Sequence, residues 1–540
     1  MRTLLLAATA LLLASAASAA DFDIVIRNGK VLDGAGNPWV RADVAVKDGR
    51  IVKIGQIGGS GFKEIDAAGR YVTPGFIDMM DQSSRVLLVN GGAENKLLEG
   101  VTSVIAGEGG TPVPAADIPS YFAKLERQGI AINFGTYYSP TQARVKVMGD
   151  AAGIPTPEQI KAMGKEVDIA MHAGVFGISS ALVYAPSSFQ STADLIAMAK
   201  VASKCNAIYA THMRDEANKL VSAVKEAIQI GEEGGVKVEI FHLKAGFRPG
   251  WGKLMPDALA TIEAARERGV DVAADMYVYT AGGTGLDITV PGWVWADGKE
   301  KGIERLKDPE IRKRLKKEIV TGYPGWSNFV EAAGGWEHVS LASAHSDEYA
   351  RYNGMSIAKI GATLRKDPAD VAWDILIAGL PERATALYFM MGEPDIELAL
   401  RQPYVSIGSD AGAAVKPGEL DALSLPHPRS NGNFTRVIAE YVEKRHVLTL
   451  PEAVRKMTSW PAARMGLSDR GLVREGMRAD LLVFDPAKVK DVATYEQPLL
   501  LSTGIDEVVV NGVLAVDDGK VTGLRGGHVL RHTCSAPMAD

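Results

Sequence analysis

Glu108, His212, His242 and Asp410 are the side chains best suited to chemistry, because each ends a short, strand-like apolar run. Two neutral imidazoles and a carboxylate suit Zn²⁺ or a similar divalent ion, and they leave a position open to water. An ion bound in this way makes water more acidic and polarises a carbonyl group. The set therefore predicts metal-assisted hydrolysis at one zinc ion, or at another divalent metal.

Asp410, in Gly408-Ser409-Asp410, is the predicted general base. A carboxylate beside the attacking water can take its proton and pass it to the leaving amine, whether or not it also binds the metal. Each residue alone has a simpler explanation. A histidine at a strand end is often only hydrogen-bonded, and an aspartate after a serine often caps a helix. Histidines on two successive strand ends, with an acid on the last strand, favour the metal site.

The elements that must position these residues lie in the middle of the chain, residues 74–465, where strands alternate with helical patterns such as the stripe Leu220, Val224, Ile228 after the expected cap Asp215. Such alternation predicts a parallel sheet with helical crossovers. Eight parallel strands in this order predict an α/β fold of the (β/α)₈ TIM-barrel type, with its chemistry at the carboxyl ends of the strands. The expected strands are near 73–78, 101–106, 131–137, 174–179, 207–212, 236–242, 270–276 and 403–409.

Short strands separated by turns flank this middle segment on both sides, in residues 21–73 and 466–530. They predict one small β-sandwich built from both ends of the chain. A long, Trp-rich stretch at about 285–345 interrupts the barrel pattern. A long insertion of this kind is typically a lid or another functional element.

Residues 1–20 have the pattern of a cleaved signal peptide, with Arg2, an apolar segment and Ala17-Ser18-Ala19. We therefore expect a periplasmic or secreted protein, with no membrane span after cleavage. The net charge of −6 without a basic stripe argues against a nucleic-acid partner. Cys205 and Cys534 are expected to be free thiols, although export permits a disulfide. The expected partner is a small-molecule substrate, and an oligomer is compatible with the sequence.

An ordered set of motifs resembles the amidohydrolase superfamily, specifically its D-aminoacylase or N-acyl-D-amino-acid deacylase branch, over most of the mature chain. A single motif such as Gly-Ser-Asp is a weak indication of the family, but the complete set in this order is a strong one. The motifs are Asp23-Ile24-Val25-Ile26-Arg27-Asn28-Gly29, Pro74-Gly75-Phe76-Ile77-Asp78, Gly100-Val101-Thr102-Ser103-Val104, Thr211-His212-Met213-Arg214-Asp215-Glu216, His242-Leu243-Lys244, Gly408-Ser409-Asp410, His427-Pro428-Arg429 and Gly476-Met477-Arg478-Ala479-Asp480-Leu481.

The resemblance implies a zinc site with His212 and His242, and Asp410 as general base. It also implies that Lys244 and Arg429 bind the substrate carboxylate, with Tyr277 or Tyr279 nearby. A fixed arginine is the natural bidentate partner of a carboxylate. The expected activity is hydrolysis of the amide bond of N-acyl-D-amino acids or related N-acyl or peptide substrates.

The sequence departs from the family pattern at two turns. Met80 and Gln82 stand where the superfamily usually has His-x-His after the first strand, which argues against a second metal there. The deacylases carry a ligating cysteine in the turn after the second strand. Here Gly109 occupies that position and Glu108 precedes it, so we predict that the carboxylate of Glu108 replaces the thiolate.

Other functions stay open at this point. The same fold could serve a dipeptidase or a cyclic amidohydrolase, because the loops that line the pocket decide the substrate. The stereochemistry of the substrate, D or L, rests on the resemblance alone. A protein of a different class, which binds ligand without catalysis, is also compatible with the missing histidines of the first strand.

Overall fold

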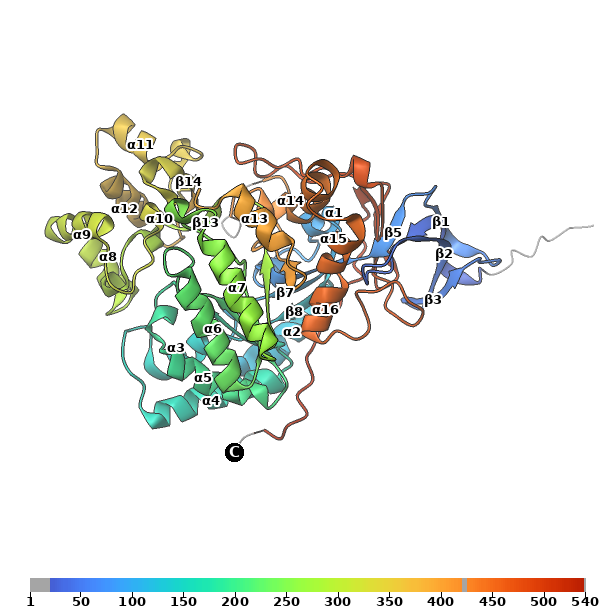
Figure 1. Cartoon of the computed structure of the whole chain (residues 1–540), viewed down its shortest axis with the longest axis horizontal. Coiled ribbons are helices and arrows are strands. Elements are labelled where there is room, and N and C mark those ends of the chain that lie inside the picture. Colours follow the sequence, from blue (N-terminus) through green and yellow to red (C-terminus); the bar gives the residue numbers. More distant parts are fainter. Residues whose placement is uncertain (1–19, 420–424, 539–540) are drawn as a thin grey trace, which may run out of the picture.

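The computed structural model describes residues 20–419 and 425–538, so the predicted signal peptide lies outside the described residues except for Ala20. Figure 1 shows a sheet of strands at one end, which includes β1 (Phe22–Val31), β2 (Val40–Lys47) and β3 (Arg50–Gly55), and a group of helices that includes α9 (Pro309–Thr321) and α11 (Ile357–Leu364) at the other end. The barrel lies between them. No helix in the described ranges is both long and apolar enough to cross a lipid bilayer.

The barrel consists of two parallel sheets, in the orders β6-β7-β8 and β16-β12-β11-β10-β9. Parallel bridges from Asp81 to Ala411 and from Tyr138 to Ile178 join their edges and close the ring. All of the expected barrel strands are present, and this confirms the predicted fold class. Their bounds are β6 Phe76–Asp81, β7 Val101–Ala106, β8 Asn133–Thr136, β9 Gly177–Ala181, β10 Ile208–His212, β11 Lys237–Ile240, β12 Val272–Met276 and β16 Val405–Ile407.

Helices connect the strands and cover the barrel from outside. The predicted stripe of α6, Leu220, Val224 and Ile228, is buried. Asp215 is not the cap of this helix: Lys219 is the N-cap residue, and Asp215 accepts the backbone N–H groups of Ala217 and Lys219 instead. The helices associated with the barrel are α1 Glu94–Leu98, α2 Ile118–Gln128, α3 Pro140–Met148, α4 Pro157–His172, α5 Thr192–Ser203, α6 Leu220–Gly234, α7 Leu254–Glu267, α13 Glu393–Leu400, α14 Arg429–Arg436, α15 Leu450–Met457 and α16 Ser459–Met465.

Strands from the two terminal segments belong to one sheet. Their strands join in a nine-stranded mixed sheet, in which β5 pairs in parallel with β1 and antiparallel with β17. Alternating burial along these strands gives the sheet an apolar face that forms its own core. The strands are β1 Phe22–Val31, β2 Val40–Lys47, β3 Arg50–Gly55, β4 Gly61–Asp66, β5 Tyr71–Pro74, β17 Leu481–Phe484, β18 Ile505–Val510, β19 Val513–Asp517 and β20 Lys520–Val521.

The insertion after β12 is largely helical and extends further along the chain than the stretch 285–345. It packs around a separate hydrophobic core and an antiparallel sheet in the order β13-β15-β14. Figure 1 shows α8, α9, α11 and α12 on the side of the barrel away from β1–β3. The elements are β13 Gly282–Gly285, α8 Lys299–Lys307, α9 Pro309–Thr321, α10 Phe329–Ala333, β14 Val339–Ser343, α11 Ile357–Leu364, α12 Pro368–Ala378 and β15 Thr385–Tyr388.

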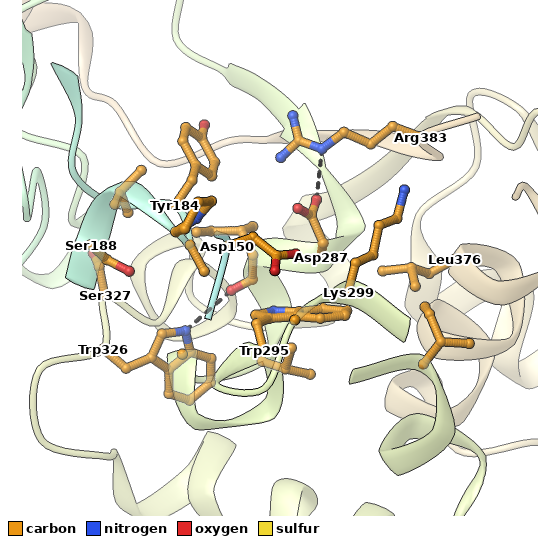
Figure 2. Close-up of a pocket in the computed structure, with 18 of the residues that line it drawn as sticks. Asp150, Tyr184, Ser188, Asp287, Trp295, Lys299, Trp326, Ser327, Leu376 and Arg383 are labelled. Atoms are coloured by element: carbon orange, nitrogen blue, oxygen red, sulfur yellow. Dashed lines mark hydrogen bonds and ion pairs between the residues drawn. The ribbon is translucent and has the colours of Figure 1, made fainter. Parts of the chain in front are cut away.

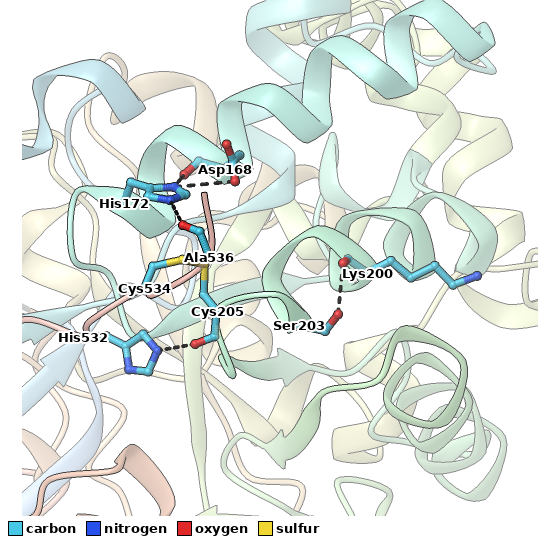
Figure 3. The surroundings of a disulfide bond; sticks show 8 residues. All are labelled: Asp168, His172, Lys200, Ser203, Cys205, His532, Cys534 and Ala536. Atoms are coloured by element: carbon cyan, nitrogen blue, oxygen red, sulfur yellow. Dashed lines mark hydrogen bonds and ion pairs between the residues drawn. A yellow bond between two sulfur atoms is a disulfide. The ribbon is translucent and has the colours of Figure 1, made fainter. Parts of the chain in front are cut away.

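Cys205 and Cys534 form a disulfide, so the prediction of free thiols is wrong. The C-terminal segment folds back against the barrel, where His532 hydrogen-bonds to the Cys205 carbonyl at 2.7 Å and His172 to the Ala536 carbonyl at 2.9 Å (Figure 3). Distance along the sequence, 329 residues, hid this proximity. The bond ties the chain end to the turn between α5 and β10.

Candidate active site

The predicted site residues lie together at the carboxyl ends of the barrel strands. His212 is the last residue of β10, while Glu108, His242 and Asp410 follow β7, β11 and β16. His242 and Asp410 have positive φ angles of 37° and 50°, which non-glycine residues rarely adopt. Backbone strain of this kind concentrates at functional sites, because the surrounding structure must hold it in place.

Glu108, His212 and His242 form a candidate metal site. The Nδ1 atom of His212 lies 2.7 Å from Glu108 Oε1, and the Nε2 atom of His242 lies 3.1 Å from the same oxygen. One ligand atom from each residue lies within 4.8 Å of the others. Two imidazole nitrogens and a carboxylate oxygen suit zinc, and three protein ligands leave a position open, as in catalytic sites. The residues present therefore fit the ion.

The charges in this cluster favour a cation. Burial would raise the pKa of Glu108, but hydrogen bonds from His212 and His242 lower it well below its ordinary value. Burial and Lys244 would lower the pKa of His242, yet the neighbouring carboxylates raise it to about 10. Because imidazole binds a metal in its neutral form, metal binding at this site is expected to depend on pH.

Glu216 lies close to both imidazoles on the side away from Glu108, although His212 Nε2 makes no hydrogen bond among the described residues. Its carboxylate lies 3.3 Å from His212 Nε2 and 3.0 Å from His242 Nδ1, and it accepts a hydrogen bond of 2.6 Å from Lys244. Carboxylates in this position fix the orientation of metal-binding histidines. Glu216 was not among the predicted site residues. Its spacing of four residues from His212 was the only signal. Such spacing brings side chains together on a helix, but Glu216 follows a strand.

Asp410 lies next to the group formed by Glu108, His212 and His242. It is not in the described group whose ligand atoms lie within 4.8 Å of one another. Its carboxylate pairs with the Arg429 guanidinium at 2.9 Å and accepts a hydrogen bond of 3.3 Å from Gln82. Gln82 also donates to Glu108 Oε2 at 2.9 Å. Gln82 therefore links the proposed base to the metal site from the position of a superfamily histidine.

Met80, in the other superfamily histidine position, is buried in an apolar cluster inside the barrel with Ile105 and Phe241. The Met80 thioether therefore packs as an ordinary apolar side chain at a position where the superfamily has a metal ligand. Among the described residues, one group has the geometry to hold a metal ion.

The four predicted substrate-binding residues differ in their placement. Arg429, Lys244 and Tyr277 line the same cavity as the metal site, and the Arg429 guanidinium lies 4.5 Å from the centre of the Tyr277 ring. Tyr279 lies behind that cavity, against His427 and Tyr495. The structure therefore favours Tyr277 over Tyr279 for contact with a substrate.

Arg429 Nε and Tyr277 Oη are buried and have no hydrogen-bond partner among the described residues, whereas Arg429 Nη1 lies 2.9 Å from Asp410 Oδ2. Buried donors are nearly always satisfied, so such groups call for a missing partner. The cavity that they face has a volume of about 310 Å³ and contains the Glu108, His212 and Asp410 side chains. We call it the active-site cavity. Its size and polar groups fit a small anionic ligand.

Comparison with known proteins shows the family of the chain. Residues 320–516 match the model of the amidohydrolase family. The chain is 32% identical to N-acyl-D-glutamate deacylase and 31% identical to D-aminoacylase, both from Alcaligenes xylosoxydans xylosoxydans, over 95% of this chain and 97% and 98% of those proteins. A crystal structure of N-acyl-D-glutamate deacylase from Bordetella bronchiseptica, with zinc and a phosphonate inhibitor, superposes with a TM-score of 0.78 at 31% identity, covering 94% of this chain and 99% of that one.

Proposed function

Because this chain belongs to the D-aminoacylase and N-acyl-D-amino-acid deacylase branch of the amidohydrolase superfamily, we propose that it hydrolyses the amide bond of N-acyl-D-amino acids. The observation that carries the proposal is the buried guanidinium of Arg429, which lines the cavity of the metal site next to Asp410. A substrate carboxylate is a natural partner for a guanidinium, since it can accept parallel N–H bonds.

Each residue has a distinct part in the proposed reaction. Glu108, His212 and His242 would hold a zinc ion, which when bound supplies Lewis-acid chemistry by polarising the substrate carbonyl and making water more acidic. Asp410 would take the proton of the attacking water and deliver it to the leaving nitrogen. Arg429, with Lys244 and Tyr277 beside it, would fix the carboxylate so that the amide lies next to Asp410.

The direct test is a panel of N-acetyl amino acids in both configurations, together with dipeptides and cyclic amides, given to the zinc-loaded enzyme. We expect release of the free amino acid from the D-forms, and at least tenfold slower reaction of the L-forms. Exclusive cleavage of L-forms, dipeptides or cyclic amides would overturn the proposed substrate. No cleavage by a protein with a full complement of zinc would favour a ligand-binding protein.

The role of Asp410 can be tested separately by Asp410→Asn. Loss of a general base lowers kcat by about 10²- to 10⁴-fold. Since Asp410 is outside the described metal-ligand group, the variant should keep its zinc. A variant that turns over at the wild-type rate would exclude Asp410 as the base, and one that loses its zinc would instead make Asp410 a ligand.

We also propose that the enzyme is exported. The disulfide between Cys205 and Cys534 supports this location, because such bonds persist in oxidising compartments. Fractionation of cells of the source organism, followed by detection of the chain shortened by its signal peptide, would test the proposal. Recovery of the uncut chain from the cytoplasm would contradict it.

A further inference from the structure

A second cavity of about 360 Å³ lies between the loop after β9 and the insertion, and we call it the outer cavity. Figure 2 shows Trp295, Trp326 and Leu376 around its interior. Its apolar lining includes Val183, Ile288, Val290, Trp295, Trp326 and Leu376.

Several polar groups in the lining of the outer cavity are engaged with other groups. The Trp326 indole donates its N–H to the Ile288 carbonyl at 3.2 Å. Arg214 is bound to Glu226 and to two backbone carbonyls, and Asp287 accepts a 2.8 Å hydrogen bond from Arg383. The lining also includes Asp150, Lys299 and Glu382, so its apolar side chains form one part of the cavity wall, and that part favours an apolar group of a ligand.

The outer cavity adjoins the active-site cavity. Tyr184 and Arg383 line both, so their side chains form a common wall. The Arg383 guanidinium lies 5.1 Å from the centre of the Tyr184 ring, and the Tyr184 ring centre lies 5.2 Å from that of His212. Tyr184 therefore has the metal site on one side and the outer cavity on the other.

The order of the strands indicates which part of a substrate reaches this wall. Arg429 and Lys244, the proposed carboxylate partners, follow β16 and β11, whereas Tyr184 follows β9 on the far edge of the same sheet. Asp410, which would protonate the leaving nitrogen, pairs with Arg429. With the amino acid held on the β11–β16 side, the acyl group extends toward Tyr184.

We infer that the outer cavity binds an extended apolar acyl group of the substrate, so that the enzyme prefers aliphatic acyl chains longer than acetyl. The inference rests on the proposed function, and it adds the acyl class of the substrate. Burial of one methylene strengthens binding by about fourfold. A chain that passes Tyr184 and Arg383 and enters the outer cavity should gain by this factor with each carbon it buries.

The test uses N-acetyl-, N-butanoyl-, N-hexanoyl- and N-octanoyl-D-methionine with the zinc-loaded enzyme. We expect kcat/KM to rise at least tenfold from the acetyl to the hexanoyl substrate. Val183→Trp, which fills part of the outer cavity, should remove this rise while it leaves turnover of the acetyl substrate within about twofold. Val320→Trp is the matched control, because Val320 is 85% exposed on α9, outside the cavity lining.

A wild-type kcat/KM that is flat or falls with chain length would overturn the inference while leaving the deacylase activity intact. Equal chain-length dependence in Val183→Trp and the wild type would also overturn it. If Val183→Trp does not fold, Ile303→Phe, at another half-buried position of the lining, takes its place.

Calorimetric titration separates the inference from the proposed function. If the wild type hydrolyses none of the four compounds, the proposed function fails. The outer cavity is then tested by binding of N-hexanoyl-D-methionine against N-acetyl-D-methionine. At least tenfold tighter binding of the hexanoyl compound in the wild type but not in Val183→Trp would support the cavity as an acyl site, and equal binding would overturn it.

Discussion

Substitution of Glu216 by glutamine tests whether this carboxylate orients the metal-binding histidines. The change keeps the shape of the side chain and removes its charge. Glu216 contacts His212 and His242 on the ring nitrogens that face away from Glu108, at 3.3 and 3.0 Å. Loss of such a partner typically lowers metal affinity by about 10- to 100-fold. This corresponds to about 1.4 to 2.7 kcal/mol of binding free energy.

Stability should fall as well, for a different reason. Glu216 and Lys244 form a pair with side chains only 2% and 7% exposed, so the variant leaves a buried ammonium without its counter-charge. Breaking a buried pair on one side costs about 3–5 kcal/mol of unfolding free energy. The double variant Glu216→Gln/Lys244→Met removes both charges. It should recover much of this stability but not the metal affinity.

The assay is competition for zinc with a chelator of known affinity, alongside urea unfolding of the metal-free proteins. Glu226→Gln is the matched control, because Glu226 pairs with Arg214 rather than with a histidine. Wild-type zinc affinity in Glu216→Gln would refute the proposed orienting role. Recovery of zinc affinity in the double variant would show that the unpaired charge of Lys244, and not the histidine orientation, caused the loss.

Three further predictions follow from other contacts. Cys205→Ala/Cys534→Ala should lower the unfolding free energy by about 2–5 kcal/mol, as measured by urea unfolding, and leave kcat unchanged. The reason is that the disulfide ties the C-terminal segment to the barrel far from the site. Equal stability of the variant and the wild type would contradict this prediction. Burial raises the pKa of Glu99 from 4.5 to about 8, so the folded chain keeps a proton that the unfolded chain releases. The unfolding free energy should therefore fall as pH rises between about pH 5 and pH 9, and urea titrations should show a smaller fall for Glu99→Gln than for the wild type. An unchanged slope of unfolding free energy against pH would count against this prediction. Arg429→Lys should raise KM by about tenfold, with zinc content unchanged, since lysine cannot offer two parallel donors; an unchanged KM would exclude Arg429 as the carboxylate partner.

Much of the fold could be predicted from the sequence because each barrel strand is a short apolar run with its own flanking turns. The strand-end position of His212, His242 and Asp410 then followed from the topology, since parallel strands bring their carboxyl ends to one face. Glu108 was predicted from its place after the second strand. The structure brings it to both histidines.

The rest depended on contacts between segments that are far apart in sequence. Gln82 reaches Asp410 across 328 positions, and Cys205 reaches Cys534 across 329. No local sequence pattern predicts contacts between residues so far apart in the chain. Glu216 and Tyr184 escaped notice for a related reason: their roles depend on where side chains point after a strand has ended, and hydrophobic periodicity carries no information about irregular backbone.

The most direct test of the metal site is elemental analysis of the purified full-length protein and of Glu108→Ala, with Glu226→Gln as the control. The three-residue site predicts about one zinc, or another divalent ion, per chain in the wild type and in the control. It predicts a large loss of metal in Glu108→Ala. A wild-type protein without stoichiometric metal after loading, or a Glu108→Ala variant that retains its ion, would contradict the account.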